Sequence, residues 1–349
     1  MNDIGNLHSP PESTAPGPVE ALQRLLAELT ALIEQIEVSV KSGAHGALPR
    51  LIAANEAATR RIMEDIGTLF HDVAASGEPS EVVDRVRELA ATRLSAWSST
   101  SPLFYRVLHT SRESFDNFEI AALLVENRLA GGNVAAQILD HYYLNMVTSS
   151  SFRNRIGQFV SYLAAETRRR ATETHPVRIL NLHTGAGREL ELLAKHRAFT
   201  EAVHVTCLDR DPTALRRARL RLRRLAGRSQ FVKADARKYA ASRAWPESPY
   251  DIIYTVNLFD QLDDQQTAEL IADCRRGLAP GGVLIFGNYS PELPIPERAI
   301  IAQLMNWNIR CRPADEWRQI FAQTWLDPEC VRFEPEELQV SHLVIATRP

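Results

Sequence analysis

A short apolar segment that ends in two glycines and continues into a helical segment constrains the fold of this chain most. The apolar residues run from Val177 to Leu182, and the glycines are Gly185 and Gly187. Leucines at helical spacing follow in residues 188–193. A strand, a tight glycine turn and a helix bring the backbone close to a nucleotide-like ligand. The segment therefore predicts an α/β domain that binds such a ligand.

Acidic residues end the next two predicted strands. Residues 203–208 are almost all apolar or β-branched and lead to Asp209, and residues 230–234 lead to Asp235. A carboxylate at the tip of the second strand is placed to accept both hydroxyls of a ribose. A carboxylate at the third tip is placed to accept the exocyclic amine of an adenine. Residues 250–255 and 282–287 predict two further strands, the second after a turn over residues 278–281.

The end of the chain predicts an antiparallel strand. Residues 331–333 and 341–347 both have strand character, and only a short connection containing Pro335 separates them. Two consecutive strands without a helix between them cannot both be parallel neighbours.

In the glycine turn, Leu190 stands where a dinucleotide fingerprint requires its third glycine. That glycine allows close helix packing beside a pyrophosphate. A cofactor without a pyrophosphate is therefore favoured over a nicotinamide dinucleotide.

In this order and spacing, the five strands and their tips resemble the class I S-adenosylmethionine (SAM)-dependent methyltransferases. The resemblance implies SAM as cofactor and a Rossmann-like, seven-stranded sheet with its last strand antiparallel, preceded here by an N-terminal helical region. It implies cofactor contacts from His183, Thr184, Gly185, Ala186, Gly187, Asp209, Arg210, Asp235, Ala236 and Asn257.

The turn departs from this family at His183, where glycine is usual. In one interpretation the side chain turns away and SAM still binds through the two glycines. In the other the site is altered in affinity or has lost methyl transfer. We favour the first interpretation.

The first half of the chain has helical periodicity only. Residues 1–18 hold four prolines and predict a disordered tail. Residues 19–95 predict a bundle of three helices, which begin near Leu22, Pro49 and Ser80. Residues 96–175 predict a helical linker or cap, and residues 176–349 the methyltransferase core. We expect the bundle to be a packing or homodimerisation module, with a regulatory sensor as the alternative. We also expect it to be separable, so that a chain beginning near Ser95 still binds SAM.

Composition favours a soluble, cytoplasmic protein. The formal net charge is −3, which does not by itself suggest a nucleic-acid or membrane partner. Arginines crowd residues 210–228, but an apolar stripe interrupts them, so they predict a solvated helix face. The four cysteines are scattered, which favours a reducing compartment and no metal site. We identify no segment long and apolar enough to span a membrane and no signal peptide.

A narrower resemblance covers roughly Ser101 to the C-terminus. Seven segments look like the bacterial methyltransferases linked to 3-hydroxy fatty acid methyl esters, the signals once called extracellular factor. These segments are residues 101–104, 115–119, 133–140, 152–156, 257–264, 287–291 and 305–312. The chain departs from that pattern at Asn306 and Cys311. The resemblance implies methyl transfer to the carboxylate oxygen of a fatty or other small organic acid.

A carboxylate is ionised at neutral pH, so no strong general base is needed and the sequence assigns no catalytic residue. An arginine suits a carboxylate because its guanidinium makes two parallel hydrogen bonds to it. Candidate substrate residues are Arg153, Arg155, Arg310 and Arg312, together with Tyr143, Asn288 and Tyr289. An RNA, a protein or another small molecule stays open as acceptor, as does a non-catalytic, SAM-binding regulatory protein.

Overall fold

The computed structural model describes residues 16–42, 48–109, 118–242, 249–305, 307–324 and 328–349. The predicted tail up to residue 15, residues 115–117 and Asn306 lie outside these ranges. The helices are α1 (Pro18–Lys41), α2 (Leu48–Ala54), α3 (Glu56–Ala75), α4 (Ser80–Ser98), α5 (Pro102–His109), α6 (Phe118–Glu126), α7 (Val134–Leu144), α8 (Val147–Arg170), α9 (Arg188–Leu193), α10 (Arg197–Ala202), α11 (Pro212–Arg221), α12 (Ala236–Ala241), α13 (Asp264–Gly277), α14 (Ile295–Leu304) and α15 (Ala314–Gln323). The strands are β1 (Val177–Leu182), β2 (Val203–Asp209), β3 (Ser229–Lys233), β4 (Tyr250–Thr255), β5 (Leu278–Tyr289), β6 (Val331–Pro335) and β7 (Ser341–Thr347).

The strands form one seven-stranded sheet in the order β3-β2-β1-β4-β5-β7-β6. Neighbouring strands from β3 to β5 are parallel, and β7 pairs antiparallel with both β5 and β6. The predicted fold class is therefore confirmed. One strand is longer than predicted, because β5 begins at Leu278 and includes the expected turn. Its pairing with β4 shifts register between Tyr250 and Ile252, and Gly281 supplies the positive φ of +69° that this irregularity needs.

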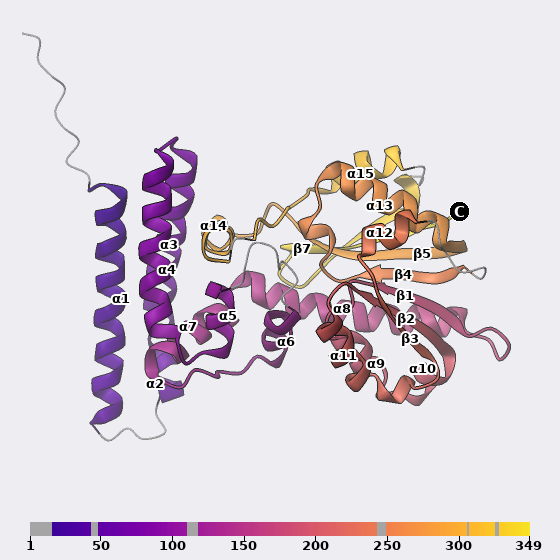
Figure 1. The fold of residues 1–349 in the computed structure, drawn as a ribbon, viewed down its shortest axis with the longest axis horizontal. Helices are drawn as coiled ribbons and strands as arrows, with labels where there is room; N and C mark the ends of the chain where they lie inside the picture. The colour runs from indigo at the N-terminus through magenta and orange to yellow at the C-terminus, as the bar shows by residue number, and fades with distance from the viewer. Residues whose placement is uncertain (1–15, 43–47, 110–117, 243–248, 306, 325–327) are drawn as a thin grey trace, which may run out of the picture.

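Helices cover both faces of the sheet (Figure 1). Alternate residues of each strand point to opposite faces, so neighbouring residues of β1 enter different cores. Ile179 packs in the cluster that includes α8, α9 and α10, and Leu180 packs in the cluster with α12, α13 and α15. Both side chains have no exposed surface. The carboxyl ends of the parallel strands are left for a ligand.

The N-terminal helices α1, α3 and α4 stand beside the sheet domain and pack on one another. Their buried side chains recur at helical spacing, as Leu22, Leu26 and Leu29 do in α1. The second predicted helix is two helices, because the chain breaks at Asn55. The Asn55 amide donates to the Leu51 carbonyl over 2.8 Å, a local bond that competes with helix continuation. No helix within the described residues has both the length and the apolar character required to cross a bilayer.

Helix α14, from the C-terminal half of the chain, packs directly on α3 (Figure 1). Gly67 permits this contact, since a Cβ atom there would lie 2.4 Å from the Pro296 carbonyl oxygen. The next residue of α14, Glu297, is buried and accepts from the backbone N–H groups of Val147 and Thr148 over 2.7 and 2.8 Å. Helix α14 therefore connects the N-terminal helices to the start of α8, a contact between distant segments that the sequence did not predict.

Candidate functional site

The glycine turn between β1 and α9 has left-handed backbone at three positions. The φ angle is +67° at His183, +55° at Gly185 and +63° at Gly187. Glycine occupies this region freely, whereas a residue with a Cβ is strained there. The Gly185 N–H donates to Asp209 Oδ2 over 2.7 Å, and the Thr184 N–H donates to the backbone of β2. The turn is thus held against the tip of β2, and His183 occupies a strained position within it.

Two hollows lie at the carboxyl ends of the strands, where open α/β sheets bind ligands. They meet at three shared lining residues, His183, Asp209 and Trp307. The first hollow follows the glycine turn toward α6, α7 and α8, and the second follows the tips of β2 and β3. A ligand that spans both would therefore cross the sheet at the glycine turn.

The second hollow holds the predicted nucleoside residues. Asp209, Arg210, Asp235 and Ala236 all line it. Asp235 also caps α12, because its Oδ1 accepts from two backbone N–H groups over 3.1 and 3.0 Å. Asp209 Oδ1 accepts from the Asp211 N–H over 2.8 Å, so this carboxylate shapes its own loop as well as the hollow. Ionised oxygens keep spare acceptor capacity, so both residues fit the hydroxyl and amine donors of an adenosine.

A buried acid that the sequence analysis missed lies at the other end of the glycine turn. Glu189 lines the first hollow and is 3% exposed. Its Oε1 accepts from the Asn181 amide over 2.9 Å and from the Tyr254 hydroxyl over 2.8 Å. Burial raises the pKa of the Glu189 carboxyl, and the hydrogen bonds from Tyr254 and Asn181 oppose that rise. A cationic ligand group would satisfy this carboxylate, and the amino-acid end of SAM carries an ammonium. The acidic first turn after Gly187 was the available signal.

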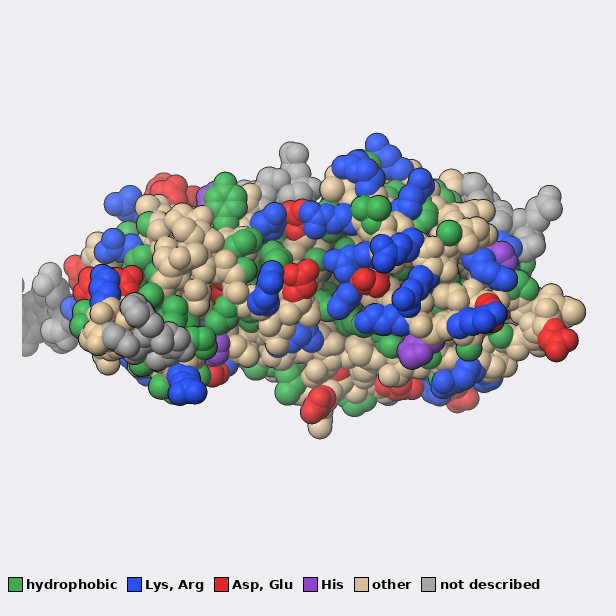
Figure 2. Space-filling view, turned by 90° about the horizontal axis from the view of Figure 1, so that it is seen from below, with side chains coloured by type: hydrophobic (Ala, Val, Ile, Leu, Met, Phe, Trp, Pro, Cys, Tyr) green, Lys and Arg blue, Asp and Glu red, His purple; other side chains and the backbone are tan. Residues whose placement is uncertain are grey.

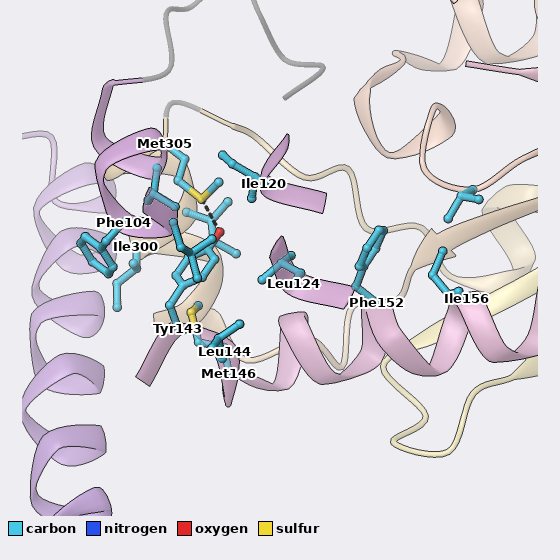
Figure 3. Close-up of a cluster of buried hydrophobic side chains, with 14 of the residues drawn as sticks. Phe104, Ile120, Leu124, Tyr143, Leu144, Met146, Phe152, Ile156, Ile300 and Met305 are labelled. Carbon is cyan, nitrogen blue, oxygen red and sulfur yellow. Dashed lines mark hydrogen bonds between the residues drawn. The ribbon is translucent and has the colours of Figure 1, made fainter. Parts of the chain in front are cut away.

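Apolar side chains from several helices form the far wall of the first hollow (Figure 3). Tyr143 lies among them, and its hydroxyl donates to Met305 Sδ over 2.7 Å. Burial raises the pKa of the Tyr143 hydroxyl well above its usual range. The larger apolar members of this wall are Phe118, Ile120, Leu124, Val125, Phe152, Ile156, Ile301 and Met305. Such a wall suits an apolar acceptor with few polar groups.

The structure does not bring Arg153 or Arg155 into either hollow. Arg155 has no exposed surface, and its Nη1 lies 2.8 Å from Asp260 Oδ2, which is equally buried. Its guanidinium also lies 4.2 Å from the centre of the Tyr289 ring. Arg153 is half-buried and donates to Ser150 Oγ over 2.9 Å. Arg155 is thus positioned to support the hollow from behind Tyr289, and not to meet a substrate carboxylate.

The other two arginine candidates differ from each other. Arg312 is 1% exposed and forms ion pairs with Asp264 at 2.9 Å and Glu316 at 3.1 Å, so it is engaged within the protein. Arg310 is half exposed, lies 3.9 Å from Asp264 and lines the second hollow. Arg310 is therefore placed beside the predicted nucleoside and away from the apolar wall.

Among the residues at the strand tips, Asn257 and Tyr289 line the first hollow. The Tyr289 hydroxyl donates to the Thr148 carbonyl over 3.0 Å, so its ring is fixed as part of the wall. Asn288 has no exposed surface and donates to Asp260 Oδ1 over 2.7 Å. Asn288 therefore orients the partner of Arg155 and lies outside the residues that line the hollow.

Comparison with known proteins assigns the core. Residues 179–282 match a family described as a methyltransferase domain. A possible exported protein from Bordetella parapertussis is similar in structure, with 20% sequence identity, a TM-score of 0.58, and 85% of this chain and 97% of that chain covered. The CurJ carbon methyltransferase is also similar, with 15% identity, a TM-score of 0.51, and coverage of 95% and 98%. No curated protein matches the sequence. At these identities the structural likeness concerns the fold.

The matched domain begins within β1, contains β2 to β4 and ends within β5. It thus includes the glycine turn and both acidic strand tips. The chain is a methyltransferase that uses SAM as its cofactor. The arrangement fits SAM: Asp209 and Asp235 face the nucleoside hollow, and the buried Glu189 faces the hollow beside the glycine turn.

Proposed function

We propose that this methyltransferase esterifies the carboxylate of an apolar organic acid, such as a long-chain 3-hydroxy fatty acid. The observation that carries the proposal is the apolar wall of the first hollow, which adjoins the glycine turn. The acyl chain would lie along this wall and exclude water from the reacting end. SAM supplies an activated methyl group, so the protein has to place a carboxylate oxygen in line behind it.

Two polar side chains that line the first hollow support a carboxylate there, Asn257 and Trp307. Trp307 Nε1 is buried and has no hydrogen-bond partner among the described residues. A buried donor without a partner is costly, and a ligand acceptor would relieve that cost. We infer that the indole N–H and the Asn257 amide hold the acid, the role first expected of an arginine.

The reaction is tested with purified protein, SAM and a panel of fatty acids of different chain length, with and without a 3-hydroxyl group. Mass spectrometry should detect methyl esters, and esterification should increase with chain length. The matching primary amides and alcohols should stay unmethylated, because they lack the carboxylate oxygen. Methyl transfer into RNA or protein, or tight SAM binding without turnover on any acid, would contradict the proposal.

A single substitution tests the carboxylate contact. Trp307→Phe removes the indole N–H and keeps an aromatic ring, so the KM for the acid should rise by about tenfold, as expected for one lost hydrogen bond to a charged group. The Kd for SAM should stay within about twofold if the indole N–H serves only the acid. Trp97→Phe in α4 is the matched control, since Trp97 lies outside both hollows. An unchanged KM in Trp307→Phe would remove this contact from the proposal.

A further inference from the structure

Helix α11 and the turn that follows it carry a dense group of arginines. Residues 212–234 contain eight basic side chains and no acidic side chain. Figure 2 views the molecule from the side on which α11 lies in Figure 1 and shows Lys and Arg side chains gathered there. The whole chain has a formal net charge of only −3, so its charge is distributed unevenly. A local surface of this kind attracts anionic partners that the net charge does not reveal.

Most of these arginines are not neutralised by carboxylates. Arg217 pairs with Glu119 and Arg221 pairs with Glu191, each over 2.7 Å. Within the described part of the chain, four other exposed arginines form no ion pair with an acidic residue: Arg216, Arg219, Arg223 and Arg224. We call these four arginines and Leu220 the basic face.

Leu220 distinguishes the basic face from an ordinary solvated helix surface. Its side chain is 73% exposed, although the other leucines of this segment are buried. A single exposed leucine is common, but this one stands between Arg219 and Arg221 on a helix surface rich in arginine. Basic side chains around an exposed apolar residue are typical of helices that lie at a lipid interface.

The basic face adjoins the wall of the first hollow. Arg217, next to Arg216, joins α11 to α6 through its ion pair with Glu119. The Arg217 guanidinium also lies 5.4 Å from the centre of the Phe118 ring, and Phe118 lines the hollow. A surface that binds the basic face would therefore lie beside the α6 wall of the apolar hollow.

We propose that the basic face docks the enzyme on an anionic lipid surface. The arginines bind lipid phosphates, for which the guanidinium is suited, and Leu220 enters the boundary between headgroups and acyl chains. The choice of lipid over an acidic protein or a nucleic acid rests on the proposed function, because an apolar acid that fits the first hollow partitions into bilayers. Docking then places the α6 wall near the acceptor. Each arginine near an anionic surface adds to the attraction, and salt screens it.

The test is sedimentation of the full chain, without SAM, with two kinds of vesicle. One kind is phosphatidylcholine alone, and the other contains phosphatidylglycerol as well. The protein should bind the anionic vesicles only, and binding should fall as salt rises. Arg223→Glu with Arg224→Glu should weaken binding by about tenfold or more, because two attractive charges become repulsive. Leu220→Ser should weaken it at unchanged charge.

The matched control is Arg276→Glu with Arg318→Glu, which reverses two exposed arginines on α13 and α15, on the opposite face of the sheet. This control should bind anionic vesicles as the parent does. No binding to either vesicle, equal binding to both, or equal losses in the two double variants would overturn the proposal. Binding of RNA or polyglutamate without vesicle binding would do so as well. Esterification of short, water-soluble acids is measured separately, so the proposed reaction and the docking surface can fail independently.

Discussion

Gly67→Ala tests whether α14 is seated on α3 as the structure shows. A Cβ at Gly67 would lie 2.4 Å from the carbonyl oxygen of Pro296 and 2.8 Å from its carbonyl carbon. Both atoms belong to the backbone, so no side-chain rotation relieves the contact. The two helices must separate, and we expect the free energy of unfolding to fall.

The magnitude follows from two opposing effects. Added volume at a tightly packed position costs about 1–3 kcal/mol. Alanine is preferred over glycine within a helix by about 0.5–1 kcal/mol. The expected net loss is therefore about 0–2.5 kcal/mol. Gly157→Ala in α8 is the matched control, since a Cβ at Gly157 meets no atom within 4 Å. The control should gain about 0.5–1 kcal/mol from the helix preference alone.

Urea denaturation followed by circular dichroism measures the difference between the two variants, in which the helix preference cancels. We expect that difference to be about 1–3 kcal/mol. Ile301 of α14 lines the first hollow, so Gly67→Ala should also raise the KM for the acceptor more than the Kd for SAM. If Gly67→Ala stabilises the protein as much as Gly157→Ala does, the contact between α3 and α14 is wrong.

Four further substitutions address the site. Arg155→Ala should lower the free energy of unfolding, measured by urea denaturation, by about 3–5 kcal/mol, because it leaves Asp260 buried without its cation. Replacing the exposed Arg310 by alanine should lower it by less than about 1 kcal/mol. Similar losses in the two variants would contradict the buried ion pair. Asp209→Ala should weaken SAM affinity, measured by calorimetry, by tenfold or more. The reason is the loss of charge-assisted hydrogen bonds of about 1.5–3 kcal/mol each, together with a loosened glycine turn. Unchanged affinity would remove Asp209 from the site. Glu189→Gln should weaken SAM binding. In the parent, SAM affinity should fall as the pH drops through the raised pKa of Glu189, because the protonated acid no longer attracts the ammonium. If Glu189→Gln leaves this pH profile unchanged, Glu189 does not have this role. His183→Gly should leave SAM affinity unchanged or modestly higher, since glycine relieves the strained φ angle. A large loss of turnover at unchanged stability would instead show that His183 contacts the cofactor or the acceptor.

Local signals explain why the core could be predicted from the sequence. Most of the strands are short, largely apolar or β-branched runs, and Gly185 and Gly187 supply the backbone freedom that the turn requires. Asp209 is the last residue of β2, and Asp235 follows the end of β3 by two residues. Both reach the same edge of the sheet, because parallel strands end together. The predicted nucleoside residues Asp209 and Asp235 accordingly line one hollow.

Long-range packing explains what the sequence analysis missed. Arginine was expected to bind a carboxylate, and Arg155 does so, but its partner Asp260 lies 105 residues away within the same core. Nothing near Gly67 in the sequence indicates that Pro296 lies against it. The sequence by itself determined the order of strands and helices, since propensity, turn chemistry and hydrophobic period act over a few residues. Only the tertiary structure decided which charged groups are paired and buried, because pairing depends on contacts between segments that the chain brings together from far apart.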